Sequence, residues 1–580
     1  MTGTGTSRPG TGDERLGSLF HRFWPFTHGL RRWMLLGLAL TAVTPIIEAA
    51  EIWLFKLLVD EVLVPQDLEA LPALVVAFVA LNLASGAIGF GEVMTSAWVG
   101  ERFLLRVRGS LFGHMLRLSP LQLGRRPLGD VLTRLSGDAA AIEGFLVAGP
   151  TAAVASVARV AIFAGMLVWI DPLLAALALV ATPLFWLLGR RFSGAIRSAA
   201  REKRRRSGAV QALAEDVLSA LPQVQAACAE DFERQRFERE GRAVVRAEMH
   251  ASRILALFRP LTDLVELSGG LAVVVGGAWA LSAGRLTLGE LLAFMTYLTQ
   301  LYAPVRDLTD LAASASTAAA GAERIAEVLD EEPVVADVDH GVQPTGLRGI
   351  VRFDDVSFRY PGTERWALER LSFEARPGTV TAVVGPSGAG KSTLVWLLLR
   401  MADAEGGAVL LDGHDVRTMS LRSLRSHVGV LLQDTYLFDG TVAENVAYGA
   451  EPHRSDEVDR ALRAADADGF VGRLSQGVHS RLGPKGRTLS GGQRRRIALA
   501  RALHDHRPVL ILDEFSAGLD ATSTARVLQT LRRSDRTVLV VTHDPAVAAL
   551  ADQILVVEDG RIRGADCVVE TTHSDVEVAV

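Results

Sequence analysis

The sequence holds very few cysteines. Cys228 and Cys567 are the only two in 580 residues, and they lie far apart without a second metal-ligand pair beside them. We therefore expect neither a disulfide framework nor a zinc site, since both need several closely spaced cysteines. The chain also lacks an excess of basic charge, because its net charge is −5 and its pI is near 6.3. A nucleic-acid partner is therefore not expected.

The beginning of the chain shows no cleavable signal peptide. Residues 1–15 are rich in Gly, Thr and Ser and are predicted to be disordered. No short apolar core with a small-residue cleavage site follows them. The next segment, 16–30, contains four aromatic residues: Phe20, Phe23, Trp24 and Phe26. Such aromatics are typical of a segment on a membrane surface, so residues 1–32 are interpreted as a tail and an interfacial helix. An ordinary packed helix is the alternative.

Long apolar runs are abundant in the first half. Hydrophobic residues make up 49% of the chain and mean hydropathy is +0.24, although 22% of the residues are charged. A spanning helix needs roughly 20 mostly apolar residues. Six such segments are predicted: 33–58, 68–98, 150–170, 172–189, 258–282 and 287–312. Only Asp171-Pro172 separates the third from the fourth, which predicts a tight turn and an antiparallel hairpin. A soluble bundle of six buried helices fits poorly, because the runs are too long.

Basic residues indicate the orientation of these spans. Arginines and a lysine crowd 101–148 and 190–206, whereas 60–67 and 171–172 carry none and 283–286 carries only Arg285. Because cytoplasmic loops are enriched in Lys and Arg, both long basic stretches and both termini are predicted to be cytoplasmic. A multi-pass protein of the cell membrane follows, with its second half in the cytoplasm.

The basic stretches have a helical pattern that extends beyond the bilayer. Segments 101–119 and 207–250 are amphipathic, and we expect them to reach the second half and transmit motion. Charged linkers that only fix topology are the alternative.

Five ionisable residues fall in or near the spans: Glu48, Glu51, Lys56, Glu92 and Arg159. Such residues are costly in a membrane and often functional. A substrate contact is considered for Glu48 and Glu51, with interhelical pairing as the alternative, and Lys56 is expected to snorkel.

The second half contains a phosphate-binding loop. The apolar stretch TVTAVV at 379–384 leads into GPSGAGKS at 385–392, and TLVWLLLR follows. This order of strand, loop and helix is the context that the motif requires. Gly385, Gly388 and Gly390 let backbone N–H groups turn toward phosphate oxygens. Lys391 and Ser392 would meet the β- and γ-phosphates and Mg²⁺, respectively.

A second apolar strand carries two carboxylates. VLILDE at 509–514 ends in Asp513, placed to hold Mg²⁺ through water, and in Glu514, placed to polarise the attacking water. A helix-capping role is the alternative for Glu514. A separate glycine-rich element, LSGGQ, spans 489–493.

With these motifs on one chain, residues 350–562 resemble the nucleotide-binding domain of the ATP-binding cassette (ABC) superfamily. The whole chain is similar to half-transporters of the bacterial multidrug and lipid exporter type. The resemblance implies a multidomain fold, with an all-α six-helix transmembrane domain followed by an α/β P-loop ATPase domain. The expected boundaries are 1–32 for the tail and interfacial helix, 33–315 for the membrane domain, 316–348 for the linker, 349–562 for the cassette and 563–580 for a C-terminal tail.

The resemblance also implies roles for single residues. Tyr360 would stack on adenine, Gln433 would contact Mg²⁺ and sense the membrane helices, and His543 would contact the γ-phosphate. Ser490, Gly491, Gly492 and Gln493 would close on the γ-phosphate across a dimer, and Asp520 would link the two sites. The catalytic set is then Glu514, His543 and Gln433, and the metal set is Ser392, Gln433 and Asp513. The nucleotide-binding set is Tyr360, Gly385, Pro386, Ser387, Gly388, Ala389, Gly390, Lys391, Ser392, Thr393, Ser490, Gly491, Gly492, Gln493 and Asp520.

One loop departs from the family pattern. Many exporters carry a Gly-Glu-Arg-Gly-like loop before the signature, whereas this chain reads Gly483-Pro484-Lys485-Gly486 without the glutamate. The usual contact of that loop with the partner's cytoplasmic helices is therefore in doubt, although ATP hydrolysis is not.

The expected function is an ATP-driven exporter subunit that works by alternating access with a second half-transporter chain in the lipid bilayer. ATP and Mg²⁺ are its expected cofactors. A homodimer is favoured, and a heterodimer stays open. An importer on the same fold and an ATP-gated regulator are the alternatives, while a soluble ABC ATPase is excluded by the six spans. The substrate, a small molecule, lipid or peptide, is left open.

Overall fold

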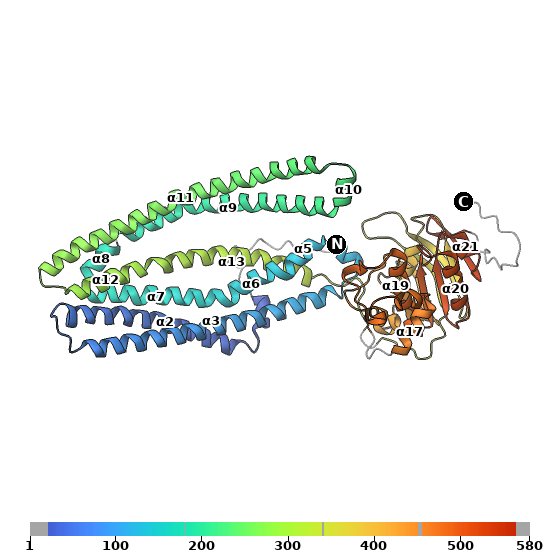
Figure 1. Cartoon of the computed structure of the whole chain (residues 1–580), viewed down its shortest axis with the longest axis horizontal. Coiled ribbons are helices and arrows are strands. Elements are labelled where there is room, and N and C mark those ends of the chain that lie inside the picture. The colour runs from blue at the N-terminus through green and yellow to red at the C-terminus, as the bar shows by residue number, and fades with distance from the viewer. Residues whose placement is uncertain (1–20, 180, 339–340, 450–454, 564–580) are drawn as a thin grey trace, which may run out of the picture. The chain divides into compact units, whose positions relative to one another are not determined.

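The computed structural model describes residues 21–179, 181–338, 341–449 and 455–563. The predictions for residues 1–20, for Cys567 and for nearly all of the C-terminal tail lie outside these ranges. The chain forms two compact units (Figure 1). Unit 1 comprises Met1–Phe112 and Gly129–Asp330, and unit 2 comprises Gly113–Leu128 and Glu331–Val580. Residues 113–128, taken from the first basic stretch, thus belong to the same unit as the cassette.

Unit 1 is helical throughout its described part. Its α-helices are α2 (Arg31–Leu57), α3 (Leu71–Met115, whose last turn enters unit 2), α5 (Leu128–Thr133), α6 (Ala139–Glu143), α7 (Gly149–Ile170), α8 (Pro172–Leu179), α9 (Ala181–Ser219), α10 (Leu221–Ala226), α11 (Glu230–Ser282), α12 (Leu288–Gln300) and α13 (Tyr302–Leu329). A 3₁₀ helix, η1 (Trp24–Thr27), precedes them, and π-helical segments η2 (Leu58–Leu63), η3 (Arg134–Asp138) and η4 (Gly144–Ala148) interrupt them. Helix α2 packs on α7, α12 packs on both, and α9 runs beside α11 with α10 at their tip (Figure 1).

In their described residues, the six predicted spans are helical except at 68–70 and 287, which precede α3 and α12, and at Leu301. Four helical stretches are long and apolar enough to cross a membrane: Arg31–Leu63, Leu71–Met115, Leu128–Ile170 and Glu230–Ser282. This count refers to the described residues, and residue 180, between α8 and α9, lies outside them. The sixth predicted span is divided between α12 and α13 around Leu301. The predicted tight turn is present, because Asp171 ends α7 and its Oδ1 accepts the N–H groups of Leu173 and Leu174 at 2.8 and 3.0 Å.

Several helices are much longer than a bilayer is thick. Helix α3 has 45 residues and α11 has 53, so they extend over about 68 and 80 Å at 1.5 Å per residue. The hydrocarbon core is only about 30 Å thick. The helical continuations predicted at 101–119 and 207–250 are therefore present as far as Met115 in α3 and across α9 and α11.

The ionisable residues of the spans are mostly paired. Arg159 of α7 donates from Nε and NH2 to the two carboxylate oxygens of Glu48 at 2.7 and 2.6 Å. Lys56 lies 3.4 Å from Asp60 and 3.7 Å from Glu290, so it joins an ion-pair network. By contrast, Oε1 of Glu51 is buried without a hydrogen-bond partner. Glu48 is therefore paired between helices, as the alternative interpretation expects. Glu51 differs from Glu48, because its Oε1 has no hydrogen-bond partner.

The aromatic segment before α2 is partly packed. Phe23 is fully buried, whereas 42% of Trp24 is exposed. Arg106 of α3 donates to the carbonyl oxygens of Phe26 and His28 at 3.0 and 2.5 Å. Arg22 pairs with Asp330, the residue that caps α13. One face of this segment is therefore fixed to the helical unit, and Trp24 lies on the other.

Unit 2 contains two sheets. The six-stranded sheet has the order β10-β9-β3-β8-β7-β6, and the four-stranded sheet has the order β2-β1-β4-β5. The strands are β1 (Val351–Phe358), β2 (Leu368–Ala375), β3 (Val380–Val384), β4 (Gly406–Leu411), β5 (His414–Asp415), β6 (Val428–Leu431), β7 (Val509–Asp513), β8 (Thr537–Val541), β9 (Gln553–Glu558) and β10 (Arg561–Ile562). The helices are α4 (Pro120–Leu123), α14 (Lys391–Leu398), α15 (Leu421–Ser426), α16 (Val442–Val446), α17 (Ser455–Ala464), α18 (Asp468–Val471), α19 (Gly491–His504), α20 (Ala521–Arg532) and α21 (Pro545–Ala548), with 3₁₀ turns η5 (Gly477–His479) and η6 (Pro484–Gly486).

The larger sheet is buried on both faces. In β7, Leu510 and Leu512 point into one hydrophobic cluster with α16 and α19, while Val509 and Ile511 point into another with α14 and the smaller sheet. This two-sided burial explains the continuous apolar runs, which are typical of parallel strands. Strands β9, β3, β8, β7 and β6 are parallel, as expected of an α/β P-loop domain.

Candidate functional site

The sheet gathers most of the predicted site residues at one edge. Parallel strands place their C-terminal ends on the same side. The phosphate-binding loop follows β3, Gln433 follows β6, Asp513 and Glu514 end and follow β7, and His543 follows β8. The register confirms that these ends are level, because Val541 pairs with both Val383 and Asp513.

The loop between β3 and α14 needs its glycines. Gly390 caps α14 with a φ of +102°, and a Cβ there would lie 2.4 Å from the carbonyl oxygen of Ala367. Only glycine fits a left-handed position that also touches backbone. Lys391 then turns its ammonium group back to the loop and donates to the carbonyl oxygens of Gly385 and Pro386 at 2.6 and 2.8 Å. Burial lowers the pKa of Lys391, while Glu514 and Asp513 act in the opposite direction.

Ser392 and Asp513 form an oxygen-rich pair. The hydroxyl of Ser392 lies 3.3 Å from Oδ2 of Asp513, and Asp513 is 4% exposed. Burial raises the pKa of Asp513, and the hydrogen bond from Ser392 opposes this shift. A hydroxyl and one carboxylate are hard donors that suit Mg²⁺, which usually takes one or two carboxylates together with phosphate oxygens. The donor set therefore fits the expected Mg²⁺. In the part of the chain that the structure describes, no group of three or more His, Cys, Asp and Glu residues forms a metal site of its own.

Glu514 occupies an unusual backbone conformation between two partners. Its φ is +52°, a left-handed value that costs a non-glycine residue about 1 kcal/mol or more. Its N–H donates to the carbonyl oxygen of Val541 at 2.8 Å. Its carboxylate accepts from the side-chain amide of Gln433 at 3.2 Å and lies 3.4 Å from Nδ1 of His543. The structure thus brings the three residues of the predicted catalytic set together.

Tyr360 lies next to the phosphate-loop helix. Its hydroxyl is 3.0 Å from the hydroxyl of Thr393, and its ring meets Phe358 edge-on with 5.2 Å between centroids. The aromatic residue predicted to stack on adenine is therefore fixed to the helix that begins with Lys391.

The LSGGQ element forms a separate helix N-terminus. Ser490 caps α19: its hydroxyl accepts the N–H of Gln493 at 3.3 Å, and the Gln493 side chain accepts the N–H of Ser490 at 2.9 Å. A Cβ at Gly492 would lie 2.4 Å from the carbonyl oxygen of Gly518, so the helix needs glycine to approach this loop. Asp520 caps α20 by accepting the N–H of Ser523, and these hydrogen bonds hold its pKa below the usual range. Among the described residues, no hydrogen bond joins Ser490 or Gln493 to the phosphate-binding loop.

Sequence reasoning missed three consecutive arginines in α19. Arg494 donates to the carbonyl oxygen of Leu489 at 2.8 Å, and Arg496 donates to that of Asp466 at 3.0 Å. Arg495 donates to the carbonyl oxygens of Glu514 and Gln433, the latter at 3.0 Å. The sequence did contain a signal for these contacts, namely three arginines near the N-terminus of a helix. Cations at this positive end gain nothing from the helix dipole, so other partners are expected for them.

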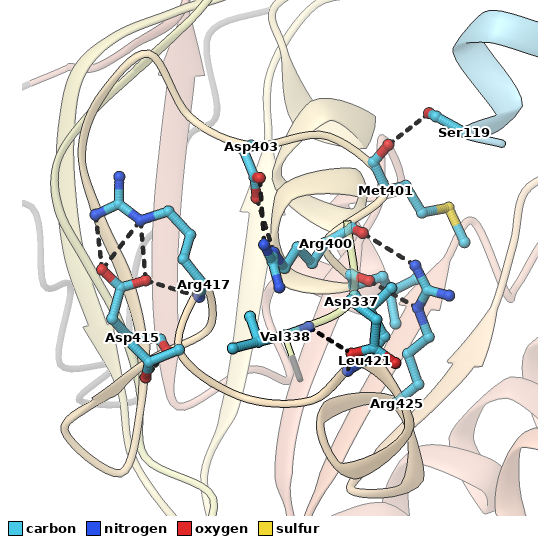
Figure 2. Close-up of polar contacts among 12 residues, drawn as sticks. Ser119, Asp337, Val338, Arg400, Met401, Asp403, Asp415, Arg417, Leu421 and Arg425 are labelled. Carbon is cyan, nitrogen blue, oxygen red and sulfur yellow. Dashed lines mark hydrogen bonds and ion pairs between the residues drawn. The ribbon is translucent and has the colours of Figure 1, made fainter. Parts of the chain in front are cut away.

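The loop at 113–128 was also not predicted to bind the cassette in this way. Ser119 caps α4 and donates from its hydroxyl to the carbonyl oxygen of Met401 at 2.6 Å (Figure 2). Gln122 donates to the carbonyl oxygen of Glu332 at 2.9 Å, and Arg126 lies 2.7 Å from Glu331. A capping-box pattern from Ser119 to Gln122 marks this helix start in the sequence. The loop thus binds both the linker and the cassette.

Met401 belongs to the segment directly after α14. Arg425 donates to the carbonyl oxygens of Leu399 and Arg400 in this segment at 3.1 and 3.0 Å (Figure 2). The linker is held nearby, since Asp337 accepts the N–H of Leu421 at the start of α15 at 2.8 Å. The segment that follows the helix beginning with Lys391 is therefore in contact with residues 113–128 of the same unit.

The loop that departs from the family pattern forms the 3₁₀ turn η6. Lys485 has a φ of +57°, and a Cβ at Gly486 would meet Leu437 at 2.9 Å. The backbone of this loop is thus closely fitted to the cassette.

Comparison with known proteins accounts for both units. Residues 34–305 match the family model of the ABC transporter transmembrane region, and residues 368–517 match the family model described as ABC transporter. An ATP-dependent lipid A-core flippase of Thiobacillus denitrificans is 32% identical over 91% of this chain and 91% of its own length. One of Syntrophus aciditrophicus is 31% identical over 88% and 85%. A putative multidrug export ATP-binding/permease protein of Bacillus subtilis is 31% identical over 80% of each chain.

A solved structure agrees with these relatives. A bacterial Atm1-family ABC exporter with ATP bound has a TM-score of 0.73 and 28% identity, covering 93% of this chain and 94% of that one. The chain belongs to the ABC transporter family, as a membrane domain fused to its ATPase. The predicted fold class and the predicted ATP-driven exporter are confirmed, and the exporter is supported over the importer. The fold is that of a multi-pass membrane half-transporter, which works as a dimer.

Proposed function

We propose that two identical copies of this chain hydrolyse Mg²⁺–ATP at shared sites and use the energy to export an amphipathic lipid. The contact of Glu514 with Gln433 and His543 carries the catalytic part of the proposal. A carboxylate with a hydrogen-bond donor on one side and an imidazole on the other is suited to orient a water molecule for attack on a phosphate.

The other residues of the edge would hold the nucleotide. Lys391 would exchange its two carbonyl partners for the β- and γ-phosphates, and the N-terminus of α14 would add backbone N–H donors. Ser392 and Asp513, with Gln433, would hold Mg²⁺, which when bound neutralises charge on the phosphates. Tyr360 would cover the base by stacking, which grips adenine more than it selects it.

A second copy would complete each site. Ser490 begins a glycine-rich helix N-terminus, which is suited to bind a phosphate, yet its hydrogen bonds remain within its own capping box. A chain with one complete phosphate-binding loop and one such N-terminus can form two equal sites when two copies face each other. The presence of Lys391, Asp513, Glu514 and His543 in the same chain favours a homodimer, because both sites are then active.

Closure of the cassettes would reach the membrane through the loop at 113–128. Ser119 binds the segment after α14, and Gln122 and Arg126 bind the linker. Movement of α14 on nucleotide binding would therefore act directly on a loop that continues α3. The basic stretches 101–148 and 190–206 favour a cytoplasmic location for this loop and for the cassette.

The substrate proposal has two supports. The relatives include lipid A-core flippases, and the membrane half holds a polar group among apolar helices. Arg159 and Glu48 form an ion pair, and Glu51 adds a carboxylate whose Oε1 is buried without a hydrogen-bond partner. An amphipathic molecule could place its polar part against these residues while its apolar part stays among the helices.

Reconstitution in proteoliposomes tests this function. With cassettes facing outward, a fluorescent phospholipid in the outer leaflet should move to the inner leaflet when Mg²⁺–ATP is added, and should not move with the Glu514→Gln variant. Full ATPase activity without ATP-dependent movement of the lipid would contradict the substrate proposal. A chain that does not hydrolyse ATP would contradict the catalytic one.

A further inference from the structure

Three consecutive arginines near the start of α19, Arg494, Arg495 and Arg496, bind backbone carbonyl oxygens, and one of them binds two site residues. Arg494 and Arg496 reach Leu489 and Asp466, outside the cluster around Glu514. Arg495 instead donates from NH1 to the carbonyl oxygen of Glu514 and from NH2 to that of Gln433. A guanidinium has a planar fork of donors, so it can fix the relative position of two acceptors.

Arg495, Gln433 and Glu514 form a closed ring of contacts. Arg495 joins the main chains of Gln433 and Glu514, and the side-chain amide of Gln433 joins the Glu514 carboxylate at 3.2 Å. The distance between the two backbones therefore determines whether the two side chains can meet. Strands β6 and β7 pair in register up to Leu431 and Leu512. Gln433 and Glu514 lie two residues beyond these partners, where the pairing has ended and Arg495 bridges the two segments.

The backbone of Glu514 needs such support. Its φ of +52° is unfavourable for a residue with a side chain, and it persists only where surrounding contacts hold it. The N–H group donates to the carbonyl oxygen of Val541, and the carbonyl oxygen of Glu514 accepts from the N–H of Ala517 at 3.2 Å and from Arg495. Of these contacts, only that of Arg495 also reaches the main chain of Gln433. Relaxation of this turn would rotate the carboxylate away from Gln433 and His543.

We propose that Arg495 is a positioning residue for ATP hydrolysis, which holds the Glu514 carboxylate in place through the two carbonyl groups. This rests on the proposed role of Glu514. Arg495 also links LSGGQ to the hydrolytic group, because it lies five residues after Ser490 on the helix that Ser490 caps. A shift of that N-terminus on closure against a second copy would move Arg495, and with it the carbonyl of Glu514.

The test is the Arg495→Met variant of the full chain in nanodiscs. Methionine keeps an unbranched side chain but donates no hydrogen bond. The Kd for ATP should stay within about twofold, because Lys391 and Tyr360 are untouched. The kcat should fall about 10- to 100-fold, the loss expected when a reacting group is displaced by about 1 Å. Arg495→Lys, which keeps a cation and several donors, should recover part of the loss. Arg532→Met, which removes an arginine paired with Asp552 on the surface, is the matched control and should keep the parent kcat.

Epistasis separates positioning from mere stability. In the Glu514→Gln background, Arg495→Met should cause no further loss in single-turnover hydrolysis, because residues that act as one unit are not additive. A multiplicative further loss would overturn the proposal, and so would a kcat within twofold of the parent. If Arg495→Met does not fold, Arg495→Lys decides by epistasis alone: the loss that it causes in the parent should disappear in the Glu514→Gln background, and an equal loss in both backgrounds would overturn the proposal. Normal turnover of Glu514→Gln alone would instead contradict the proposed role of Glu514.

Discussion

The side-chain amide of Gln433 donates to the carboxylate of Glu514 over 3.2 Å. This contact joins the residue that follows β6 to the residue that follows β7, 81 positions apart in the chain. It places a residue expected to sense the membrane helices against the group proposed to activate water. Within the cassette, the two segments that follow these neighbouring strands therefore meet through their side chains.

Glu514→Gln should bind ATP and hydrolyse it very slowly. The amide keeps the size of the side chain but cannot take a proton, so we expect kcat to fall by about 10² to 10⁴. ATP binding, measured by fluorescence with a labelled nucleotide, should be retained. Glu369→Gln removes a carboxylate that pairs with Arg561 outside the site and should keep the parent rate. A rate near that of the parent for Glu514→Gln would refute the assignment.

Asp513→Asn should stabilise the nucleotide-free protein at neutral pH while abolishing Mg²⁺-dependent turnover. Burial raises the pKa of Asp513 above its unfolded value, so the ionised carboxylate opposes folding once the pH exceeds the unfolded pKa. The gain in the free energy of unfolding of the variant over the parent should be absent at low pH. It should grow as the pH rises and become constant above the raised pKa of Asp513 in the folded state. We therefore expect a higher Tm than that of the parent at pH 8, and a difference that shrinks as the pH falls toward the unfolded pKa of an Asp, about 3.9. Thermal unfolding in nanodiscs between about pH 4 and 8 measures it, and a lower Tm at pH 8 would count against this account.

Exchange of the charges of Glu48 and Arg159 should separate structure from substrate recognition. Either Glu48→Gln or Arg159→Met leaves a charge without its partner among apolar helices, which costs several kcal/mol, so both single variants should assemble poorly. The double variant Glu48→Arg with Arg159→Glu should recover assembly. Glu51→Gln, which removes the carboxylate whose Oε1 has no hydrogen-bond partner, should assemble normally but lose lipid-stimulated ATPase activity. Unchanged stimulation in Glu51→Gln would remove this residue from the substrate site.

Ser119→Ala should weaken coupling more than hydrolysis. It removes the cap of α4 and the hydrogen bond to Met401, at a cost of about 1 kcal/mol. Basal ATPase activity should stay within about twofold, whereas lipid-stimulated activity and transport should fall. Ser423→Ala, which removes a hydroxyl from α15 outside this contact, is the control. Equal losses of basal and stimulated activity would show that Ser119 supports only the fold.

Much of the cassette could be predicted from sequence because its chemistry is local. The phosphate-binding loop needs Gly385, Gly388 and Gly390 in fixed positions, and the parallel strands read as apolar runs. Asp513 and Glu514 follow such a run, so their edge of the sheet could be inferred. The helical spans were found for the same reason, since a bilayer requires continuous apolar length.

Other features could not be predicted because they join distant segments. The contact of Ser119 with Met401 depends on the folding of residues 113–128 with unit 2, which no local pattern encodes. The pairing of Arg159 with Glu48 depends on how α7 packs against α2. The hydrogen bonds of Arg495 to the carbonyl oxygens of Glu514 and Gln433 also depend on tertiary structure. The three arginines near a helix N-terminus indicated only that these side chains have partners outside the helix dipole.

The central claim is that each site takes Lys391 from one copy and Ser490 from the other. Co-assembly of a Lys391→Met chain with a Ser490→Arg chain, purified through two different tags, tests it most directly. If the sites are shared, this mixed dimer has one intact site and should trap nucleotide with vanadate, while each variant alone should not. A chain with both substitutions, paired with a parent chain, should then trap none. Trapping by that second pair, and none by the first, would show that Lys391 and Ser490 serve the same nucleotide within one chain and would contradict the account.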